Sequence, residues 1–547
     1  MTIKKFKKEN INFTKMNNFV KSFLLDFNVF AKKPQNYSIK THYLSNITSD
    51  VLERVNFYKN NVKNVPIVIN GKNIYCEEKS QICPYDINKT ICNYSNADDL
   101  LIKHSINHYK NAKEGFKKLT ENDKINIFNK VSDLITNKYK NDLLATTILG
   151  QGKTIHQAEI DAIGELVDFI NFNTYFYNEL VNEQLYINNS DDSYNISKWN
   201  SLNGFVASIT PFNFTAIGAN LATAPLFMNN YVLWKPSDNA ILSNYLFFEL
   251  LLEAGMPPEC ISFIPSNPET FFNEISNSSD LGALCFTGSS TVFENMYGSI
   301  GKNMKKYKNF PRIIGETGGM NFHFAFEDFN IENLVTSTLR GAFEYSGQKC
   351  SATSRLYLPK SRTNEFYDLF FKKLDNLSFD SPEKENTFSS AVINENAYSK
   401  CKNSIEKLKN ESELIYGGNY SDSIGYYIFP TVFRVNNHDK NIMNNEIFGP
   451  ILNVYEYTDV NEALELCSNN DYGLTGSIFT NIETNFMIAE KYLQNSCGNY
   501  YINDKCTGSV VFQQPFGGSK KSGTNDKAGS KYLLPRFGNN RIIKIKK

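Results

Sequence analysis

The sequence lacks the features that mark nucleic-acid-binding, membrane and metal-binding proteins. Its 57 lysines and arginines balance its 57 aspartates and glutamates, so no long-range field attracts nucleic acid or an anionic membrane. The longest apolar stretch, YLFFELLLEAG, is interrupted by Glu249 and Glu253 and is too short to span a bilayer. The ten cysteines form no CxxC pair, which fits reduced thiols, and no cluster has metal-ligand spacing. These absences predict no nucleic-acid partner, no membrane association and no metal, and they leave a small molecule as the default ligand.

Arginine is missing from the first 28 residues, which instead carry six lysines with phenylalanines between them. This composition is typical of a basic amphipathic helix of the organellar presequence kind, although such presequences are usually rich in arginine. Two interpretations of residues 1–28 therefore stay open. Either they direct the protein to the mitochondrial matrix, or they are a lysine-rich leader of a cytoplasmic protein.

The GxGxxG fingerprint of dinucleotide-binding folds is also absent, yet the order of the predicted elements is that of a doubly wound α/β fold. Strands are predicted at FVASIT, YVLWKP, ISFIPS, ALCFTGS and RIIGETGG, between Gly204 and Gly319, with a helix after each of the first four. This alternation predicts a parallel sheet whose ligands bind beyond the carboxyl ends of its strands. At one such end, Gly288 and Ser289 open a helix whose free N–H groups attract phosphate.

A chain of 547 residues exceeds what one hydrophobic core usually supports, so two or three domains are expected. Helical spacing of apolar residues from Ser105 to about Leu180 predicts a helical layer before the sheet. Residues 184–201 are typical of a hairpin with few partners of its own, and we expect another sheet or a partner subunit to pair with it. A second alternating region runs from 321 to about 496, and a tail punctuated by glycines follows.

In the second region, the stretch EYSGQKCSATSR places Cys350 after a glycine and a lysine, where we expect the head of a helix rich in small residues. An isolated cysteine is usually a buried, unreactive side chain. The interpretation changes here because Cys350 belongs to one of seven motifs. In chain order these are TPFNF (210–214), LWKPSD (233–238), FTGSS (286–290), GETGG (315–319), GQKCSA (347–352), EIFGP (446–450) and PFGGSKKSG (515–523).

This series resembles the aldehyde dehydrogenase superfamily, and the resemblance extends from about residue 30 to the end of the chain. It implies an α/β fold with a Rossmann-like NAD domain, an α/β catalytic domain and a small β oligomerisation domain, in a homodimer or a larger homo-oligomer. The implied boundaries are 29–183 with 202–315 for the NAD domain, 316–503 for the catalytic domain, and 184–201 with 504–547 for the oligomerisation hairpin, the tail and a substrate-anchor loop.

The motifs supply the residue types that aldehyde oxidation needs. A thiolate makes the carbonyl carbon tetrahedral and leaves a thioester after hydride transfer, and the resemblance implies that Cys350 is this nucleophile. The alkoxide formed by the attack needs preorganised donors, which the matching motif supplies as the Asn213 amide and the Cys350 backbone N–H. Water must then be deprotonated to cleave the thioester, and Glu316 matches the general base of the superfamily.

The resemblance also carries over cofactor contacts at the positions that match. It implies that NAD is bound by Thr210, Lys235, Gly288, Ser289, Glu446 and Phe448. Asp238 lies where the superfamily often has an acidic residue. A carboxylate there repels a 2′-phosphate, which favours NAD over NADP.

We expect substrate specificity to lie in the tail. The segments GQGKTIHQAEIDA, FEYSGQKCSA and YINDKCTGS are most similar to the branch of the superfamily that converts L-glutamate γ-semialdehyde, which forms from Δ1-pyrroline-5-carboxylate, to L-glutamate in proline catabolism. That branch implies a carboxylate-binding loop at Thr507, Gly508 and Ser509 and a further contact from Ser351. It also implies that Phe212 and Phe516 wall the aliphatic middle of the substrate. Cys506, where serine is common in relatives, places a second thiol near the mouth of the site.

Three other functions compete with this interpretation. A dehydrogenase for another aldehyde or semialdehyde would keep Cys350, Glu316 and Asn213 and lose the anchor loop. A cysteine hydrolase would need a histidine to activate the thiol, and His323 and His156 are the candidates. A catalytically silent descendant of the fold would not be expected to retain the catalytic set that is intact here.

Overall fold

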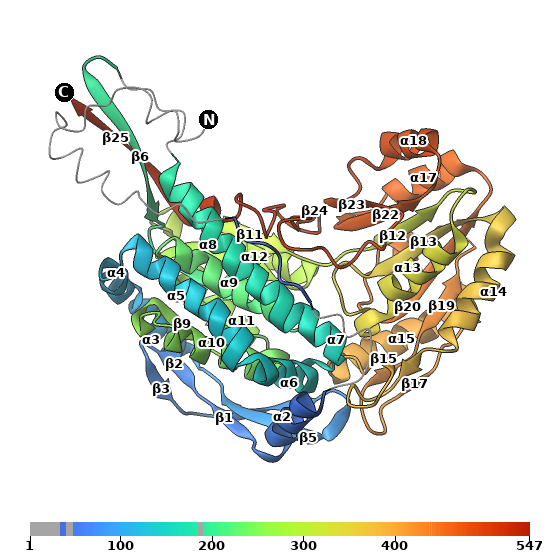
Figure 1. The fold of residues 1–547 in the computed structure, drawn as a ribbon, viewed down its shortest axis with the longest axis horizontal. Helices are drawn as coiled ribbons and strands as arrows, with labels where there is room; N and C mark the ends of the chain where they lie inside the picture. Colours follow the sequence, from blue (N-terminus) through green and yellow to red (C-terminus); the bar gives the residue numbers. More distant parts are fainter. Residues whose placement is uncertain (1–32, 40–47, 184–189, 437, 439, 547) are drawn as a thin grey trace.

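A computed structural model describes residues 33–39, 48–183, 190–436, 438 and 440–546 of the chain. The basic leader, residues 1–28, lies outside these residues, so both interpretations of it stay open. The described chain forms two α/β bodies, each built on a seven-stranded sheet, and a two-stranded ribbon that projects from the first body (Figure 1).

The first sheet contains the predicted doubly wound sheet, and its strand order is β11-β10-β7-β8-β9-β2-β3. All five predicted strands are present and parallel: β7 (Phe205–Ile209), β8 (Tyr231–Lys235), β9 (Ile261–Phe263), β10 (Leu281–Thr287) and β11 (Arg312–Glu316). The helices between them are α9 (Thr215–Phe227), α10 (Ile241–Glu253), α11 (Pro268–Asn277) and α12 (Ser290–Lys302). Strands β7 and β8 are buried at every position, which explains their continuous apolar character, because helices cover both faces of such a sheet.

Five strands precede the helical layer and were not predicted from the sequence. Strands β2 (Ile67–Ile69) and β3 (Lys72–Ile74) extend the first sheet in antiparallel fashion beyond β9. Strands β1 (Lys63–Val65), β4 (Glu78–Cys83) and β5 (Asp86–Ser95) form a separate three-stranded sheet. Most of these strands are short or partly exposed, so they lack the long apolar runs that made β7 to β11 recognisable.

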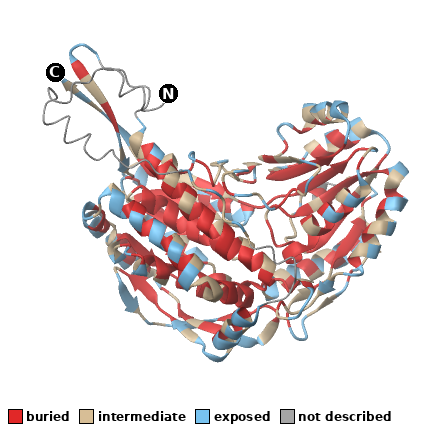
Figure 2. Ribbon diagram, in the orientation of Figure 1, coloured by how far each residue is buried: buried red, intermediate tan, exposed pale blue. Residues whose placement is uncertain are grey.

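The predicted helical layer is confirmed. Its helices are α3 (Asp99–Asn107), α4 (Tyr109–Lys117), α5 (Glu121–Asp133), α6 (Lys140–Gln151), α7 (Ile155–Ala158) and α8 (Leu166–Asn182), preceded by α2 (Ser49–Asn60). Helix α8 packs against α5 and α9, and it is buried along most of its length. Figure 2 shows that buried residues concentrate in the two sheets and in the helices that cover them.

The second sheet has the order β16-β19-β20-β13-β12-β22-β23. Its strands are β12 (Asn321–Ala325), β13 (Thr353–Pro359), β16 (Glu413–Tyr416), β19 (Thr431–Arg434), β20 (Ile451–Tyr457), β22 (Thr475–Phe479) and β23 (Asn499–Ile502). Its main helices are α13 (Ile331–Phe343), α14 (Thr363–Leu374), α15 (Glu395–Glu411), α17 (Val460–Ser468) and α18 (Glu483–Leu493). Only β16 runs antiparallel to its neighbour, so this predicted alternating region is a second parallel sheet.

The ribbon is formed by β6 (Ser193–Ser201) and β25 (Gly538–Lys546), which pair antiparallel from Ser193 opposite Lys546 to Ser201 opposite Gly538. The partner of the predicted 184–201 segment is therefore the chain's own last strand, and residues 184–189 lie outside the described part. In the tail, β24 (Ser519–Lys520) pairs with β21 (Tyr472–Gly473), which precedes β22 of the second sheet. A few residues later the Thr524 N–H donates to the Gly315 carbonyl of the first sheet at 2.8 Å. The domain boundaries given above stay a prediction.

Among the described residues, none of the helices combines the length and the apolar character that a bilayer crossing requires.

Candidate active site

Cys350 lies in a turn that joins α13 to β13. The Ala352 N–H donates to the Lys349 carbonyl at 3.0 Å and closes the turn around Cys350 and Ser351. The Asn321 side-chain amide donates to the carbonyls of Cys350 and Ala352 at 2.7 and 2.8 Å. The predicted helix head at Cys350 is therefore wrong. A side chain from β12 holds the backbone in a turn, and the following residues enter strand β13 directly.

Three consecutive residues before this turn adopt left-handed backbone conformations: Tyr345, Ser346 and Gly347 have φ of 53°, 51° and 67°. Such conformations cost of order 1–3 kcal/mol for a residue other than glycine, so surrounding contacts must hold them. The Ser346 N–H donates to the Ser389 hydroxyl at 2.6 Å. At Gly347, a Cβ would lie 2.3 Å from the Gly449 carbonyl oxygen, which explains the glycine of the GQKCSA motif. These contacts therefore fix the backbone of the segment that leads to Cys350.

Asn213 lies beside the Cys350 turn, as expected of an oxyanion donor. Its side-chain amide is buried and donates to the Gln348 carbonyl at 3.1 Å, two residues before Cys350. An amide carries two N–H groups, so this bond leaves one donor free. Within the described part of the chain, the Cys350 backbone N–H makes no hydrogen bond either. The turn thus presents two donors beside one thiol.

Three carboxyl groups act on the Cys350 thiol. Burial and the charges of Glu446, Glu316 and Glu165 raise the pKa of Cys350 to about 12. Glu316 lies at the end of β11, and its Oε2 accepts the Gly518 N–H at 3.0 Å, while Oε1 is buried without a hydrogen-bond partner among the described residues. Burial raises the pKa of Glu316 to about 8. A carboxylate with a raised pKa near neutrality suits a general base.

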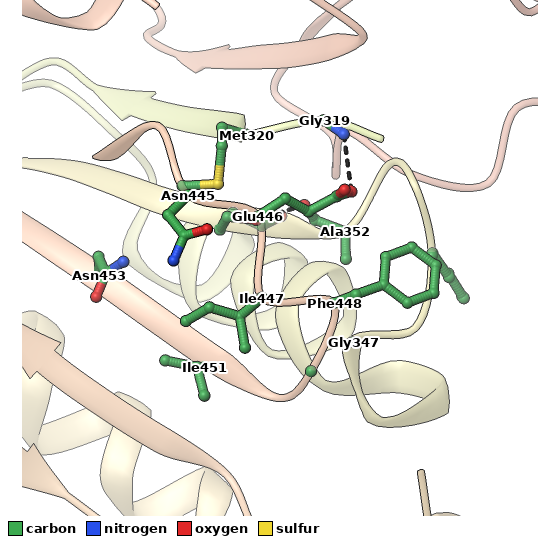
Figure 3. A pocket seen from close by; sticks show the side chains of 14 residues that line it. Gly319, Met320, Gly347, Ala352, Asn445, Glu446, Ile447, Phe448, Ile451 and Asn453 are labelled. Carbon is green, nitrogen blue, oxygen red and sulfur yellow. Dashed lines mark hydrogen bonds between the residues drawn. The ribbon is translucent and has the colours of Figure 1, made fainter. Parts of the chain in front are cut away.

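Glu446 comes from the loop before β20 and lies close to the first residues after β11 (Figure 3). Its carboxylate accepts the Gly319 N–H at 2.9 Å, the bond drawn as a dashed line in the figure. A Cβ at Gly318 would lie 1.8 Å from the Glu446 carboxylate, so the glycine pair of GETGG admits this side chain. Burial raises the pKa of Glu446 to about 7. In the same loop, Phe448 packs edge to face on Phe212, with ring centroids 6.0 Å apart.

The predicted cofactor residues of the first body gather at the carboxyl ends of β7, β8 and β10. Lys235 is buried, and its ammonium donates to the Pro236 carbonyl at 3.0 Å and lies 3.4 Å from the Asp238 carboxylate. The Thr210 hydroxyl accepts from the Trp234 indole at 3.0 Å. Because these strands are adjacent and parallel, residues far apart in the chain meet at one edge.

Helix α12 offers an anion site at the same edge. Its N-cap, Ser289, makes no side-chain cap hydrogen bond, and the buried Ser290 hydroxyl has no partner among the described residues. A Cβ at Gly288 would lie 2.7 Å from the Phe286 ring, so the glycine allows the backbone to pass closely. Free N–H groups, an unpaired hydroxyl and the helix dipole together suit a phosphate group.

The predicted anchor loop lies against the nucleophile turn. The Thr507 hydroxyl is 2.8 Å from the Ser351 hydroxyl, which neighbours Cys350. Gly508 is exposed and has φ of 86°, a conformation that favours glycine. Ser509 follows it and is half-buried. Phe516 lies further along the tail, where its N–H donates to the Ala528 carbonyl at 2.9 Å, two residues before the Gly518 that binds Glu316.

His323 does not activate the thiol. It is fully buried in β12, and burial lowers its pKa to about 3. Its Nε2 accepts the Cys506 N–H at 3.2 Å and its Nδ1 lies 3.0 Å from the Thr338 hydroxyl, so both ring nitrogens are engaged and the imidazole is neutral. Burial also lowers the pKa of His156. Within the described chain, neither ring forms a hydrogen bond with Cys350, which removes support for a cysteine hydrolase.

Two acidic residues that sequence reasoning missed also shape the site. Asp161 accepts the N–H groups of Thr215 and Ala216 at 2.9 Å each, at the start of α9, directly after the Asn213 turn. Burial raises the pKa of Glu165 to about 8, and its charge contributes to the raised pKa of Cys350. The available signal was that acidic residues, Asp161 and Glu165 among them, recur within a helical segment that is otherwise largely apolar.

Comparison with known proteins identifies the class of this arrangement. The aldehyde dehydrogenase family profile matches residues 74–541, and the chain belongs to the aldehyde dehydrogenase family. It is similar to the mitochondrial delta-1-pyrroline-5-carboxylate dehydrogenases of Dictyostelium discoideum, at 42% identity over 496 residues (89% of this chain, 88% of that protein), and of Homo sapiens, at 39% over 493 residues (89% and 87%).

A solved structure supports the same placement. The delta-pyrroline-5-carboxylate dehydrogenase from Mycobacterium tuberculosis bound with NAD matches with a TM-score of 0.88 and 31% identity, over 95% of this chain and 96% of that one. The predicted family and the predicted fold are therefore confirmed.

Proposed function

We propose that this protein oxidises L-glutamate γ-semialdehyde, which forms from Δ1-pyrroline-5-carboxylate, to L-glutamate with NAD in proline catabolism. The observation that carries the proposal is the contact between Thr507 and Ser351, which seats a loop suited to a carboxylate one residue from the Cys350 thiol. The similar proteins named above support the same substrate. The competing candidate function is oxidation of another aldehyde by the same catalytic residues.

In the proposed mechanism, Cys350 attacks the aldehyde carbon and forms a thiohemiacetal. The resulting oxygen charge is stabilised by the Asn213 amide and the Cys350 N–H, and one such donor is typically worth about 3 kcal/mol in the transition state. The thiol proton leaves to a neighbouring carboxylate, since both Glu446 and Glu316 act on this thiol. NAD, when bound, supplies the hydride acceptor. Glu316 then deprotonates the water that cleaves the thioester.

The residues at the edge of the first sheet fit NAD. The unpaired Ser290 hydroxyl and the uncapped start of α12 suit the pyrophosphate, with Gly288 and Ser289 beside it. In the proposed assignment, Lys235 and Asp238 face the adenosine ribose, Thr210 lies at the first turn, and Glu446 holds the nicotinamide ribose with Phe448 beside it. These residues bind and orient the cofactor.

Asp238 is expected to set the preference for NAD over NADP. Its carboxylate disfavours a 2′-phosphate by charge repulsion, so Asp238→Ser should raise the NADP/NAD ratio of kcat/KM by about tenfold, roughly 1.4 kcal/mol. Steady-state rates with both cofactors measure the ratio. Asp280→Ser, at a carboxylate paired with Lys308 at 2.8 Å, serves as the control and should leave the ratio unchanged. An unchanged ratio in Asp238→Ser would place the discriminating acid elsewhere.

Ser509 is expected to recognise the α-carboxylate. Charge-assisted hydrogen bonds of this kind contribute about 1.5–3 kcal/mol, so Ser509→Ala should lower kcat/KM for glutamate semialdehyde by about tenfold or more. The loss should appear chiefly in KM, because the anchor lies away from the reacting carbon. Butanal makes no such bond and should react unchanged. Equal losses with both substrates would assign Ser509 a structural role.

The α-ammonium group, which is bonded to the same carbon as the α-carboxylate, also needs an acceptor. Glu165 is the proposed acceptor, because it is a carboxyl group whose charge acts on Cys350 and whose pKa is raised by burial to about 8. In this proposal Phe212 and Phe516 line the aliphatic middle of the substrate, between the aldehyde and the carbon that carries these two groups.

Assembly and location complete the proposal. A two-stranded ribbon is marginally stable alone, and the apolar residue Ile542 of β25 is 59% exposed. Both features support a homodimer or a larger homo-oligomer in which the ribbon is covered. The relatives named mitochondrial support the mitochondrial matrix as the compartment.

The test of the proposed function is NADH production by the purified protein over a panel of aldehydes. Glutamate semialdehyde should give the highest kcat/KM, above succinate semialdehyde, propanal and butanal. A higher value for an aldehyde without an α-carboxylate would replace the proposal with the competing aldehyde dehydrogenase function.

A further inference from the structure

The side chain of Lys505 lies over the glycine of the anchor loop. Its Cε and Nζ are each 3.5 Å from the position that a Cβ of Gly508 would occupy. Gly508 itself is exposed and has a left-handed φ of 86°, and the half-buried Ser509 follows it. The ammonium therefore stands at the face of the loop that the proposed function assigns to a carboxylate.

Within the described residues, the Lys505 ammonium has no hydrogen bond and no ion pair, although the side chain is half-buried. Its neighbour Asp504 forms no ion pair with it, and the Asp504 carboxylate accepts the Lys505 backbone N–H at 2.7 Å. A half-buried ammonium without a hydrogen bond or a contact ion pair loses hydration with little compensation, so a bound anion beside it would be stabilised.

The surroundings of Lys505 add positive charge. Arg340 and Lys349 both form ion pairs with Glu344, at 2.5 and 3.0 Å. Burial opposes the ionised form of Glu344, yet Lys349 and Arg340 outweigh it and lower the pKa of Glu344 to about 2. Both cations also act on Lys505, whose pKa is lowered by burial and by these charges. The charges of Asp504 and Glu344 act on Lys505 in the opposite sense. Among these five groups the cations outnumber the carboxylates, which favours an anionic ligand.

We propose that Lys505 is a specificity-determining residue whose ammonium binds the α-carboxylate of the substrate together with the Gly508 and Ser509 backbone. This inference rests on the proposed function and adds a charge to a loop that otherwise offers N–H groups and hydroxyls. Arginine or lysine beside backbone donors is a common way to hold a carboxylate, because each makes charge-assisted hydrogen bonds. Aldehydes without a carboxylate gain nothing from Lys505.

The test compares Lys505→Met, which keeps the length of the side chain and removes its charge, with Lys505→Arg, which keeps the charge. Lys531→Met, at an exposed lysine of the same tail, is the matched control. For glutamate semialdehyde, Lys505→Met should raise KM by about tenfold with little change in kcat, and Lys505→Arg should recover most of the loss. For butanal all three variants should match the wild type. Binding of L-glutamate to the NAD-loaded protein, measured by calorimetry, should weaken by the same factor.

The salt dependence of the wild type gives a second readout, which one variant then checks. In the wild type, kcat/KM for glutamate semialdehyde should fall with ionic strength more steeply than that for butanal, and Lys505→Met should remove part of this difference. If Lys505→Met affects both aldehydes equally, or neither, while Ser509→Ala still discriminates between them, the lysine assignment is overturned and the proposed function stands. If the wild type itself shows no preference for the carboxylated aldehyde, the proposed function fails.

Discussion

Replacing Cys350 with alanine is expected to lower NADH production by at least about 10⁴-fold, because no other group can form the covalent intermediate. The residue lies in a turn closed by the Ala352 N–H and held by Asn321, and these contacts use backbone atoms that alanine retains. Folding and NAD binding should therefore persist. Steady-state NADH absorbance measures the activity, and calorimetry with NAD measures the binding.

Cys467→Ala is the matched control, since Cys467 is a fully buried thiol in α17 of the same body. This variant should keep its activity and lose only stability, as expected of a thiol that fills the core. Mass spectrometry should detect an acyl group on Cys350 in the wild type during turnover and none in Cys350→Ala. Retention of a substantial fraction of dehydrogenase activity by Cys350→Ala would exclude the covalent mechanism.

Glu316→Gln is expected to slow steady turnover by about 10²- to 10⁴-fold and to leave a stoichiometric burst of NADH. Glutamine keeps the acceptor that binds the Gly518 N–H, so the position of the side chain should be preserved. The first half of the reaction does not depend on Glu316, because Glu446, which also acts on the thiol, can accept the thiol proton. The thioester on Cys350 should therefore accumulate, and stopped-flow measurement of NADH should show the burst followed by a slow phase.

The pH dependence follows from the protonation state of the base. Burial raises the pKa of Glu316 to about 8. The carboxylate form is the active one, so turnover limited by hydrolysis should rise with pH from about 6 to 9 and level off above the pKa. Glu316→Gln should lose this rise, whereas Glu294→Gln, at an exposed carboxylate paired with Lys521, should retain it. Wild-type turnover in Glu316→Gln would remove Glu316 from the mechanism.

The alternation of strands and helices between 204 and 319 could be predicted because strands buried on both faces carry uninterrupted apolar runs. The helices α5 to α8 could be predicted for the same kind of reason, since their apolar residues recur at helical spacing. The motifs identified the candidate residues at the carboxyl ends of these strands. Local pattern was sufficient wherever burial of an element imposes a regular period on its sequence.

The turn at Cys350 could not be predicted in this way. Small residues such as those of GQKCSA are compatible with a helix, and the turn forms because Asn321, a residue of another strand, captures two carbonyls of the segment. The partner of β6 was equally hidden, because β25 lies more than three hundred residues later in the chain. Contacts between distant segments decided both features, and a local pattern carries no record of them.

The sequence by itself determined the class of this protein, the parallel strands between 204 and 319, and the residue types that aldehyde oxidation requires. The tertiary structure decided which of these residues contact one another. It brings Asn213 to the Gln348 carbonyl beside the Cys350 turn, places the Thr507 hydroxyl against Ser351, and leaves the Lys505 ammonium over Gly508 without an ion pair among the described residues. The physical reason is that pKa shifts, donor geometry and unpaired charge depend on distance and burial, which arise only when separate segments pack together.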